Sequence, residues 1–164
     1  MIFKHASSGF HISAAMTVSL VIGASSVAAG PNNVAHSVEY DDAWRQMSMG
    51  KDVAEALAEL TKASLEQTLR DQYQKNGYAL KHMPDIQPQI GLLDFGNGYL
   101  ANILVTMVYP AEQNIKDINT TFVFGIEENA LHKVVCTGTT NPLANDQCRD
   151  KLETVFGSVM LNVK

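Results

Sequence analysis

Two cysteines, Cys136 and Cys148, have the most definite chemical options in this sequence. As a disulfide they would close a loop of about 12 residues and stabilise the fold by roughly 3 kcal/mol in the chain-entropy model. With His132 they would offer zinc too few ligands, at no standard spacing, and they lack the Cys-x-x-Cys spacing of a redox centre. An even number of cysteines in an exported chain favours one disulfide. We therefore predict a disulfide, with free thiols and a metal site as the alternatives.

Histidines and carboxylates are the next candidates for chemistry. His36, His82 and His132 are far apart in the sequence, and we expect each to be a surface or half-buried residue rather than a catalyst. The carboxylates form two doublets, Asp41–Asp42 and Glu127–Glu128. Adjacent side chains point apart on a strand and lie about 100° apart on a helix. Neither doublet is therefore preset as an acid–base pair.

One enzymatic hypothesis is a small secreted hydrolase that uses Asp85 or His82, beside the prolines of segment 81–89. No serine or cysteine occurs in a nucleophile-elbow context. The glycine-rich turn at residues 95–99 is not followed by the helix and lysine that phosphate binding needs. The sequence gives no positive sign of an enzyme, and we expect no catalytic residue, no cofactor and no metal.

The composition indicates one globular domain with a short terminal segment, because 46% of the residues are hydrophobic and 18% are charged. The formal net charge is −5. This acidity argues against nucleic acid as a partner, because phosphate groups repel an acidic surface. The predicted division is residues 1–29 as an N-terminal targeting segment and residues 30–164 as a single domain.

Residues 51–77 form the clearest predicted element, an amphipathic helix that ends at Asn76–Gly77. Its predicted inward stripe consists of Val53, Ala56, Leu57, Leu60, Ser64 and Thr68, widened by Ala54, Leu65 and Leu69. Charged side chains occupy the opposite face. The preceding residues 38–50 indicate a shorter helical piece. This part of the chain thus predicts helices that cover a core on one side and meet water on the other.

A β-rich half follows a predicted linker at residues 81–89. Residues 90–95 and 99–109 read as two strands around the turn Gly96-Asn97-Gly98. Residues 120–127 and 131–140 predict a second hairpin, with three apolar side chains on one face: Phe122, Phe124 and Ile126. We therefore expect a four-stranded antiparallel meander.

The last predicted element is a short helix within residues 141–157. Asn141 is the expected N-cap, Pro142 suits the first helical position and Gly157 the end. The side chains expected to face inward are Cys148, Leu152, Val155 and Phe156. The predicted class is α+β: a long N-terminal helix packed on a four-stranded antiparallel meander sheet, with a short C-terminal helix tied by one disulfide.

The N-terminus has the parts of a bacterial secretion signal. Lys4 supplies the positive charge, residues 12–24 supply the apolar stretch, and small residues follow. Cleavage after Ala28 or Ala29 would release a domain into the periplasm or the medium. Under this interpretation residues 1–29 are absent from the mature protein.

The same stretch, GFHISAAMTVSLVIGASSVAAGP at residues 9–31, resembles the N-terminus of type IV pilins and pseudopilins. The resemblance continues through the helix-forming stretch at residues 54–77 and the cysteine pair near the C-terminus. It implies a leader cut between Gly9 and Phe10, then a helix that anchors the protein in the inner membrane through residues 10–29. Ala14 stands where pilins usually carry Glu, which places the resemblance with minor subunits. About 12 extra residues separate Pro31 from the matching helix.

Both interpretations predict a non-enzymatic exported envelope protein, located in the periplasm, at the cell surface or outside the cell. The first functional hypothesis is a pilin-like or pseudopilin-like assembly subunit of a filament or secretion system, which self-assembles. The alternative is a soluble periplasmic binding, inhibitor or immunity-type protein that contacts a protein partner. The mature N-terminus distinguishes the two.

Overall fold

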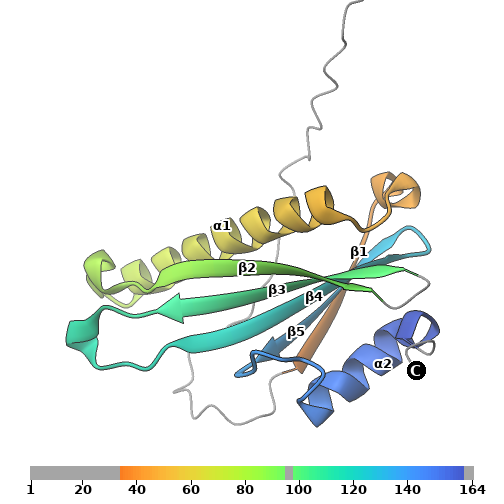
Figure 1. Cartoon of the computed structure of the whole chain (residues 1–164). Coiled ribbons are helices and arrows are strands. Elements are labelled where there is room, and N and C mark those ends of the chain that lie inside the picture. The colour runs from red at the N-terminus through yellow and green to blue at the C-terminus, as the bar shows by residue number, and fades with distance from the viewer. Residues whose placement is uncertain (1–33, 95–97, 161–164) are drawn as a thin grey trace, which may run out of the picture.

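The computed structural model describes residues 34–94 and 98–160, with side chains as far as Gly157. The predictions at Gly9, Phe10, Ala28 and Ala29 lie outside the described residues, as does most of the expected turn at 96–98. The described chain is an α+β domain, as predicted: a five-stranded antiparallel sheet carries one long helix on one face and a second helix on the other (Figure 1). The strand order is β1-β5-β4-β3-β2.

Strand β1 (Val34–Tyr40) overturns the prediction of a helical piece over residues 38–50. It pairs antiparallel with β5 (Ala130–Thr137) and adds a fifth strand to the expected four. Only a short 3-10 helix, η1 (Asp42–Gln46), follows it, and the Asp41 carboxylate caps this turn by accepting from the Ala43 N–H at 2.9 Å. The prediction failed because the free edge of β5 pairs with this stretch, a long-range contact that local periodicity does not reveal.

Helix α1 (Lys51–Lys75) confirms the predicted long helix, and Gly77, at φ 70°, follows its end as expected. Its buried stripe is rotated from the predicted one and consists of Ala54, Leu57, Ala58, Thr61, Leu65 and Leu69. Thr61 fits this stripe because its hydroxyl donates to the Leu57 carbonyl at 2.7 Å. Small and hydroxyl-bearing residues therefore lie against the sheet, while Leu60 is only half-buried.

Strand β2 (Asp85–Asp94) begins inside the segment that was predicted to be a linker. Pro88 lies within this strand, opposite Val105 of β3 (Tyr99–Val108). A proline is accepted there because β2 is an edge strand, whose outward N–H groups need no partner in the sheet. The linker prediction was wrong for residues 85–89, because a proline that cannot continue a helix can still lie in an edge strand.

The two predicted hairpins are confirmed, as β2–β3 and as β4 (Ile118–Glu127) with β5. Glu128 and Asn129 form the loop of the second hairpin with φ of 47° and 73°. Positive φ at both loop residues is the pattern of the hairpin turns that match strand twist. Glu127 pairs with Ala130 directly across this turn, which fixes the register of both strands.

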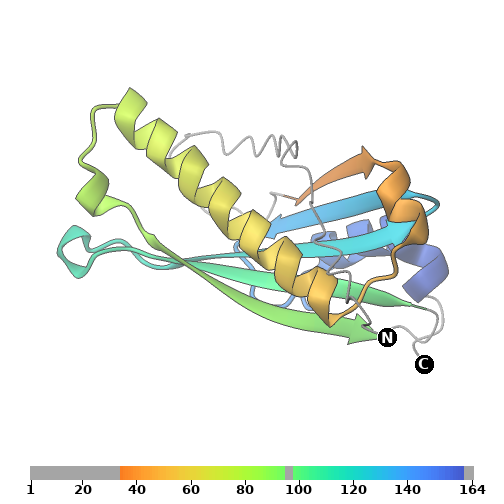
Figure 2. The same cartoon turned by 90° about the horizontal axis from the view of Figure 1, so that it is seen from above.

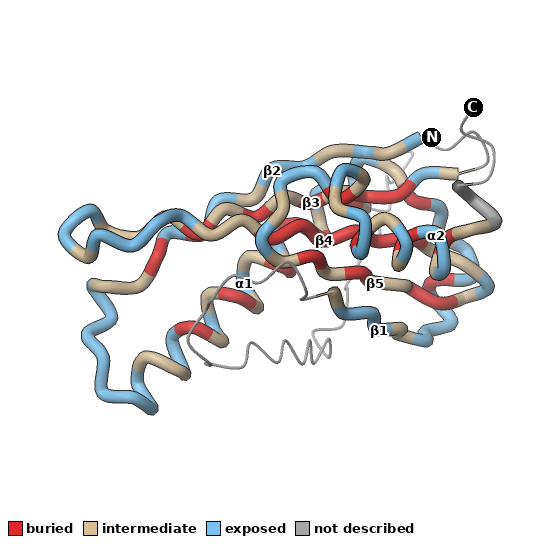
Figure 3. Tube along the Cα trace, turned by 90° about the horizontal axis from the view of Figure 1, so that it is seen from below, coloured by how far each residue is buried: buried red, intermediate tan, exposed pale blue. Residues whose placement is uncertain are grey.

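The core consists of two layers, one on each face of the sheet (Figure 3). The layer under α1 contains Phe122 and Phe124, with Ile126 packed against it, so these three side chains share a face as predicted. The layer under α2 (Asp146–Met160) contains Leu100, Val123, Val134, Leu152 and Phe156. Each helix thus closes a separate apolar layer.

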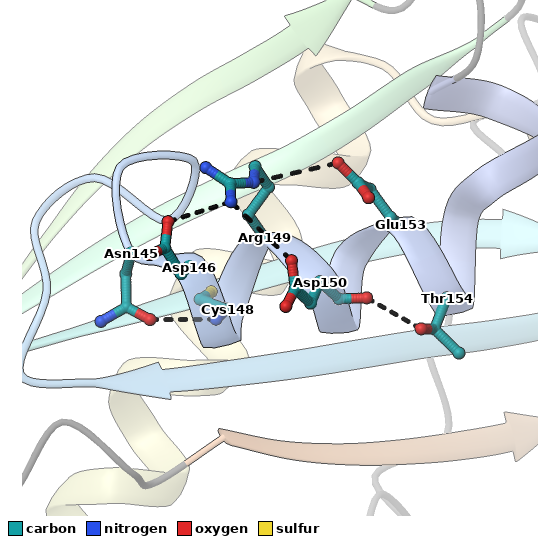
Figure 4. A network of polar contacts seen from close by, with 7 residues as sticks. All are labelled: Asn145, Asp146, Cys148, Arg149, Asp150, Glu153 and Thr154. Carbon is teal, nitrogen blue, oxygen red and sulfur yellow. Dashed lines mark hydrogen bonds and ion pairs between the residues drawn. The ribbon is translucent and has the colours of Figure 1, made fainter.

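Helix α2 begins later and extends further than expected. The Asn145 side chain, and not Asn141, accepts from the Cys148 N–H at 2.9 Å and caps the helix. Asn141 instead accepts from the Leu143 N–H in the preceding turn. The helix does not end at Gly157 but continues past it, with a local kink at Phe156. Figure 4 shows the exposed side of the helix, where Arg149 reaches the carboxylates of Asp146, Asp150 and Glu153.

Candidate functional site

The disulfide between Cys136 and Cys148 joins strand β5 to helix α2, as predicted. The two Cα atoms are 5.9 Å apart, and both side chains are fully buried in the layer under α2. Leu152 and Phe156 lie in the same layer, and Val155 packs against it. The position of the disulfide gives it a structural role, because its sulfur atoms are closed off from solvent and from other thiols.

Asp85 and His82, the alternative residues of the hydrolase hypothesis, make separate contacts. Asp85 is exposed and accepts a hydrogen bond from the Gln87 side chain at 2.9 Å. The contacts of His82 run through its backbone carbonyl, which accepts from the Tyr73 hydroxyl and from the Gln113 side chain. His82 thus supports the loop after α1 through its backbone, whereas Asp85 contacts a neighbour in its own strand. The hydrolase hypothesis stays a prediction.

Within each carboxylate doublet, the two residues occupy different local structures. Asp41 caps η1, whereas the neighbouring Asp42 pairs with Arg45 at 3.6 Å on the surface. Glu127 ends β4 and Glu128 lies in the hairpin turn. Neither doublet converges on a common point.

An apolar surface forms where helix α1 ends and where strands β3 and β4 connect, at one end of the molecule (Figure 1). We call it the aromatic end and define it by Tyr73, Tyr78, Leu80, Tyr109 and Ile115. Three of these are the outermost: Tyr78 is 63% exposed, Leu80 39% and Ile115 48%. Ile90, Leu92 and Tyr99 of β2 and β3 are exposed to a similar degree. Exposed apolar side chains gathered at one end of a small domain are a common mark of an interaction site.

Hydrogen bonds through one carbonyl group hold the aromatic end together. The His82 carbonyl, in the loop after α1, accepts from Tyr73 at 3.2 Å and from Gln113 of the β3–β4 connection at 2.7 Å. The rings of Tyr73 and Tyr78 meet edge to face, with centroids 5.7 Å apart. Two loops that are separate in the sequence are thereby joined into one surface.

Two tyrosines of the aromatic end, Tyr73 and Tyr109, have raised pKa values. Burial raises the pKa of Tyr73, and the neighbouring Tyr78 raises it further. Burial also raises the pKa of Tyr109, with a smaller effect from Tyr73. Since an ordinary phenol already titrates near pH 10, both hydroxyls stay protonated at physiological pH. The surface thus combines apolar rings with polar tips.

A second cluster brings together two histidines that are 96 positions apart in the sequence. His36 of β1 and His132 of β5 lie on the α2 side of the sheet, with their ring nitrogens Nε2 and Nδ1 3.2 Å apart. The rings are nearly parallel, and the ring of Phe156 from α2 meets that of His132 edge to face, with centroids 6.0 Å apart. The pKa of His36 is lowered from its usual value, first by burial and then by the charges of His132 and Lys151.

From the sequence we expected His36 and His132 to be separate residues, because strand β1 was not predicted. Once β1 is paired with β5, the register sets Val38 opposite His132 and His36 opposite Val134, so the two histidines are diagonal neighbours. Within residues 34–94 and 98–160, no third histidine, cysteine or carboxylate joins them in a set able to hold a metal ion. We therefore treat the pair as a hydrogen-bonded cluster.

Comparisons of the chain with protein-family models, with curated proteins and with solved structures gave no match. Among the described helices, none is both long and apolar enough to cross a membrane.

Proposed function

We propose that this chain is an exported, non-enzymatic binding module that acts through contact with a protein partner. The observation that carries the proposal is the aromatic end, an exposed apolar surface built from two loops that hydrogen bonds hold in place. Its exposed side chains gain most from being buried against another protein. No catalytic arrangement competes with this interpretation among the described residues.

The chemistry of the aromatic end suits a protein partner. Tyrosine is enriched at the energetic centres of protein interfaces, because its ring buries a large area and its hydroxyl still finds a hydrogen-bond partner. Tyr78 is the most exposed of these side chains. The rigid support beneath it reduces the entropy lost on binding, since the His82 carbonyl already fixes both loops.

Export is the second part of the proposal and is supported by two features of the sequence. The segment before residue 30 has the charge, the apolar stretch and the small residues of a secretion signal. The disulfide between Cys136 and Cys148 suits an oxidising compartment, such as the bacterial periplasm or the medium. We therefore propose cleavage after Ala28 or Ala29.

The pilin-like assembly subunit is the second candidate. It is supported by a long helix packed on an antiparallel sheet and by the disulfide near the C-terminus. Against it, strand β1 and η1 precede α1, which begins only at Lys51. Any helix formed from Phe10 onward would therefore be separated from α1, and the roughly 12 extra residues before α1 are occupied by these two elements. This separation is why we place the binding module first.

Site-specific photo-crosslinking in the cell that makes the protein tests the proposed surface. A photoreactive amino acid at Tyr78 or Ile115 should crosslink to one partner protein, identified by mass spectrometry, because these side chains would be buried in the interface. The matched control is Tyr40, which is 79% exposed on a different element and should give no such product.

The outcomes of this experiment separate the two candidates. Equal crosslinking from Tyr78 and Tyr40, or none from either, would contradict the aromatic end as the binding surface. Crosslinks between copies of this chain would instead favour the assembly subunit.

A further inference from the structure

The histidine pair joins the edge strand β1 to the rest of the sheet in a way that depends on its charge. In neutral histidines one ring nitrogen donates and the other accepts, so His36 and His132 can share a single hydrogen bond across their 3.2 Å contact. When both rings are protonated, every ring nitrogen is a donor and the acceptor is lost. The same two rings then repel each other as like charges.

The surroundings of the pair add to this repulsion. Lys151 of α2 acts on His36 as a further positive charge, and Phe156 packs its uncharged ring against His132. Side chains alternate between the two faces of a strand. Glu39 of β1 and Lys133 of β5 are next to positions that face α2, so their own side chains point to the α1 side of the sheet. Among the described groups that shift the pKa of His36, none is a carboxylate that would neutralise its charge.

Strand β1 is the element that this charge can move. It is an edge strand that pairs only with β5 among the described strands, and all of its side chains are exposed or half-buried, with His36 among the exposed ones. Its attachment therefore depends on the backbone ladder to β5 and on a few contacts, of which the histidine pair is one. Edge elements with few buried contacts open locally at a lower free energy than the core.

We propose that the His36–His132 pair is an acid-sensitive latch that holds β1 on the sheet at neutral pH and releases it as the pH falls. This proposal is independent of the aromatic end, which lies on other elements. Because the folded protein favours neutral His36, the opened state binds protons more readily. The stabilisation from the latch is therefore full above the usual histidine pKa of 6.5 and is lost as the pH falls below it.

Amide hydrogen exchange of the full-length protein at pH 7.5 and pH 5.5 tests the latch. After correction for the intrinsic pH dependence of exchange, protection of the β1 amides should fall by about fivefold or more at the lower pH. This factor corresponds to the repulsion of two unit charges roughly 4 Å apart in a water-like medium. Protection in β4, the central strand of the sheet, should change much less.

Two variants distinguish the latch from a general effect of acid. His36→Gln removes one titrating ring and should abolish the extra loss in β1, whereas His82→Gln, a matched change outside the pair, should leave it intact. If His36→Gln fails to fold, Lys151→Gln replaces it and should reduce the loss. Equal β1 protection at both pH values, or an undiminished loss in His36→Gln, would overturn the proposal.

Discussion

Replacing Phe156 with alanine is expected to lower the free energy of unfolding by about 3–5 kcal/mol, the range for truncating a fully buried aromatic side chain. Phe156 is completely buried between α2 and the sheet. It fits there because β4 has a glycine at the contact: a Cβ on Gly125 would lie 2.5 Å from the Phe156 ring and 2.6 Å from Leu100. The Phe156 ring therefore occupies the space that a side chain at position 125 would take, and its truncation would leave that space empty.

Urea denaturation measures this loss as a lower transition midpoint at an unchanged slope. Thr154→Ala is the matched control on the same helix, since Thr154 is exposed and its hydroxyl bonds only to the Asp150 carbonyl one turn earlier. It should change stability by less than about 0.5 kcal/mol. An equal midpoint for Phe156→Ala and the wild type would show that α2 does not close the second core layer.

Cys136→Ser should lower the free energy of unfolding by about 3 kcal/mol under oxidising conditions, because the unfolded chain regains the freedom that the loop closure removed. The disulfide also holds α2 to β5 from the buried side, where Cys136 is 1% and Cys148 0% exposed. Cys148→Ser and the double variant should lose nearly the same amount, since a single bond is lost in each. Chemical denaturation with and without a reductant measures the effect.

The reductant is the internal control for the disulfide. It should bring the wild type down to the stability of Cys136→Ser and should leave that variant unchanged. If the denaturation midpoint of the wild type is the same with and without reductant, the disulfide does not stabilise the fold.

Several elements of the fold were predictable because their signals are local. The helix from Lys51 follows from its periodic pattern and its glycine stop, and the two hairpins follow from alternating apolar residues around turns. The disulfide was predicted from the even number of cysteines in a chain expected to be exported, and from the lack of zinc-site or redox spacing around them. Each of these signals lies within a few tens of residues.

Long-range pairing explains what the sequence did not predict. Strand β1 pairs with β5 from almost 100 residues away, and nothing local to residues 34–40 marks that partner. The histidine pair was missed for the same reason, because it exists only in that register. The buried stripe of α1 was misplaced since Thr61 looks polar in the sequence but satisfies its hydroxyl within the helix.

The aromatic end was also hidden from the sequence. Tyr73, Tyr78 and Leu80 lie near a helix end, whereas Tyr109 and Ile115 follow a strand some 30 residues later. Hydrogen bonds to the His82 carbonyl bring the two groups together. The available signal was the set of aromatic and aliphatic residues in and beside two predicted loops. The sequence does not reveal that these two loops lie together.

The central claim, that this chain is an exported binding module rather than an anchored assembly subunit, is tested most directly by the N-terminus of the mature protein. Intact-mass measurement and N-terminal sequencing of protein from the producing cell determine it. We predict a chain that starts at Ala29 or Gly30 and is recovered in the soluble exported fraction. A chain that starts at Phe10 and stays with the inner membrane would contradict the claim.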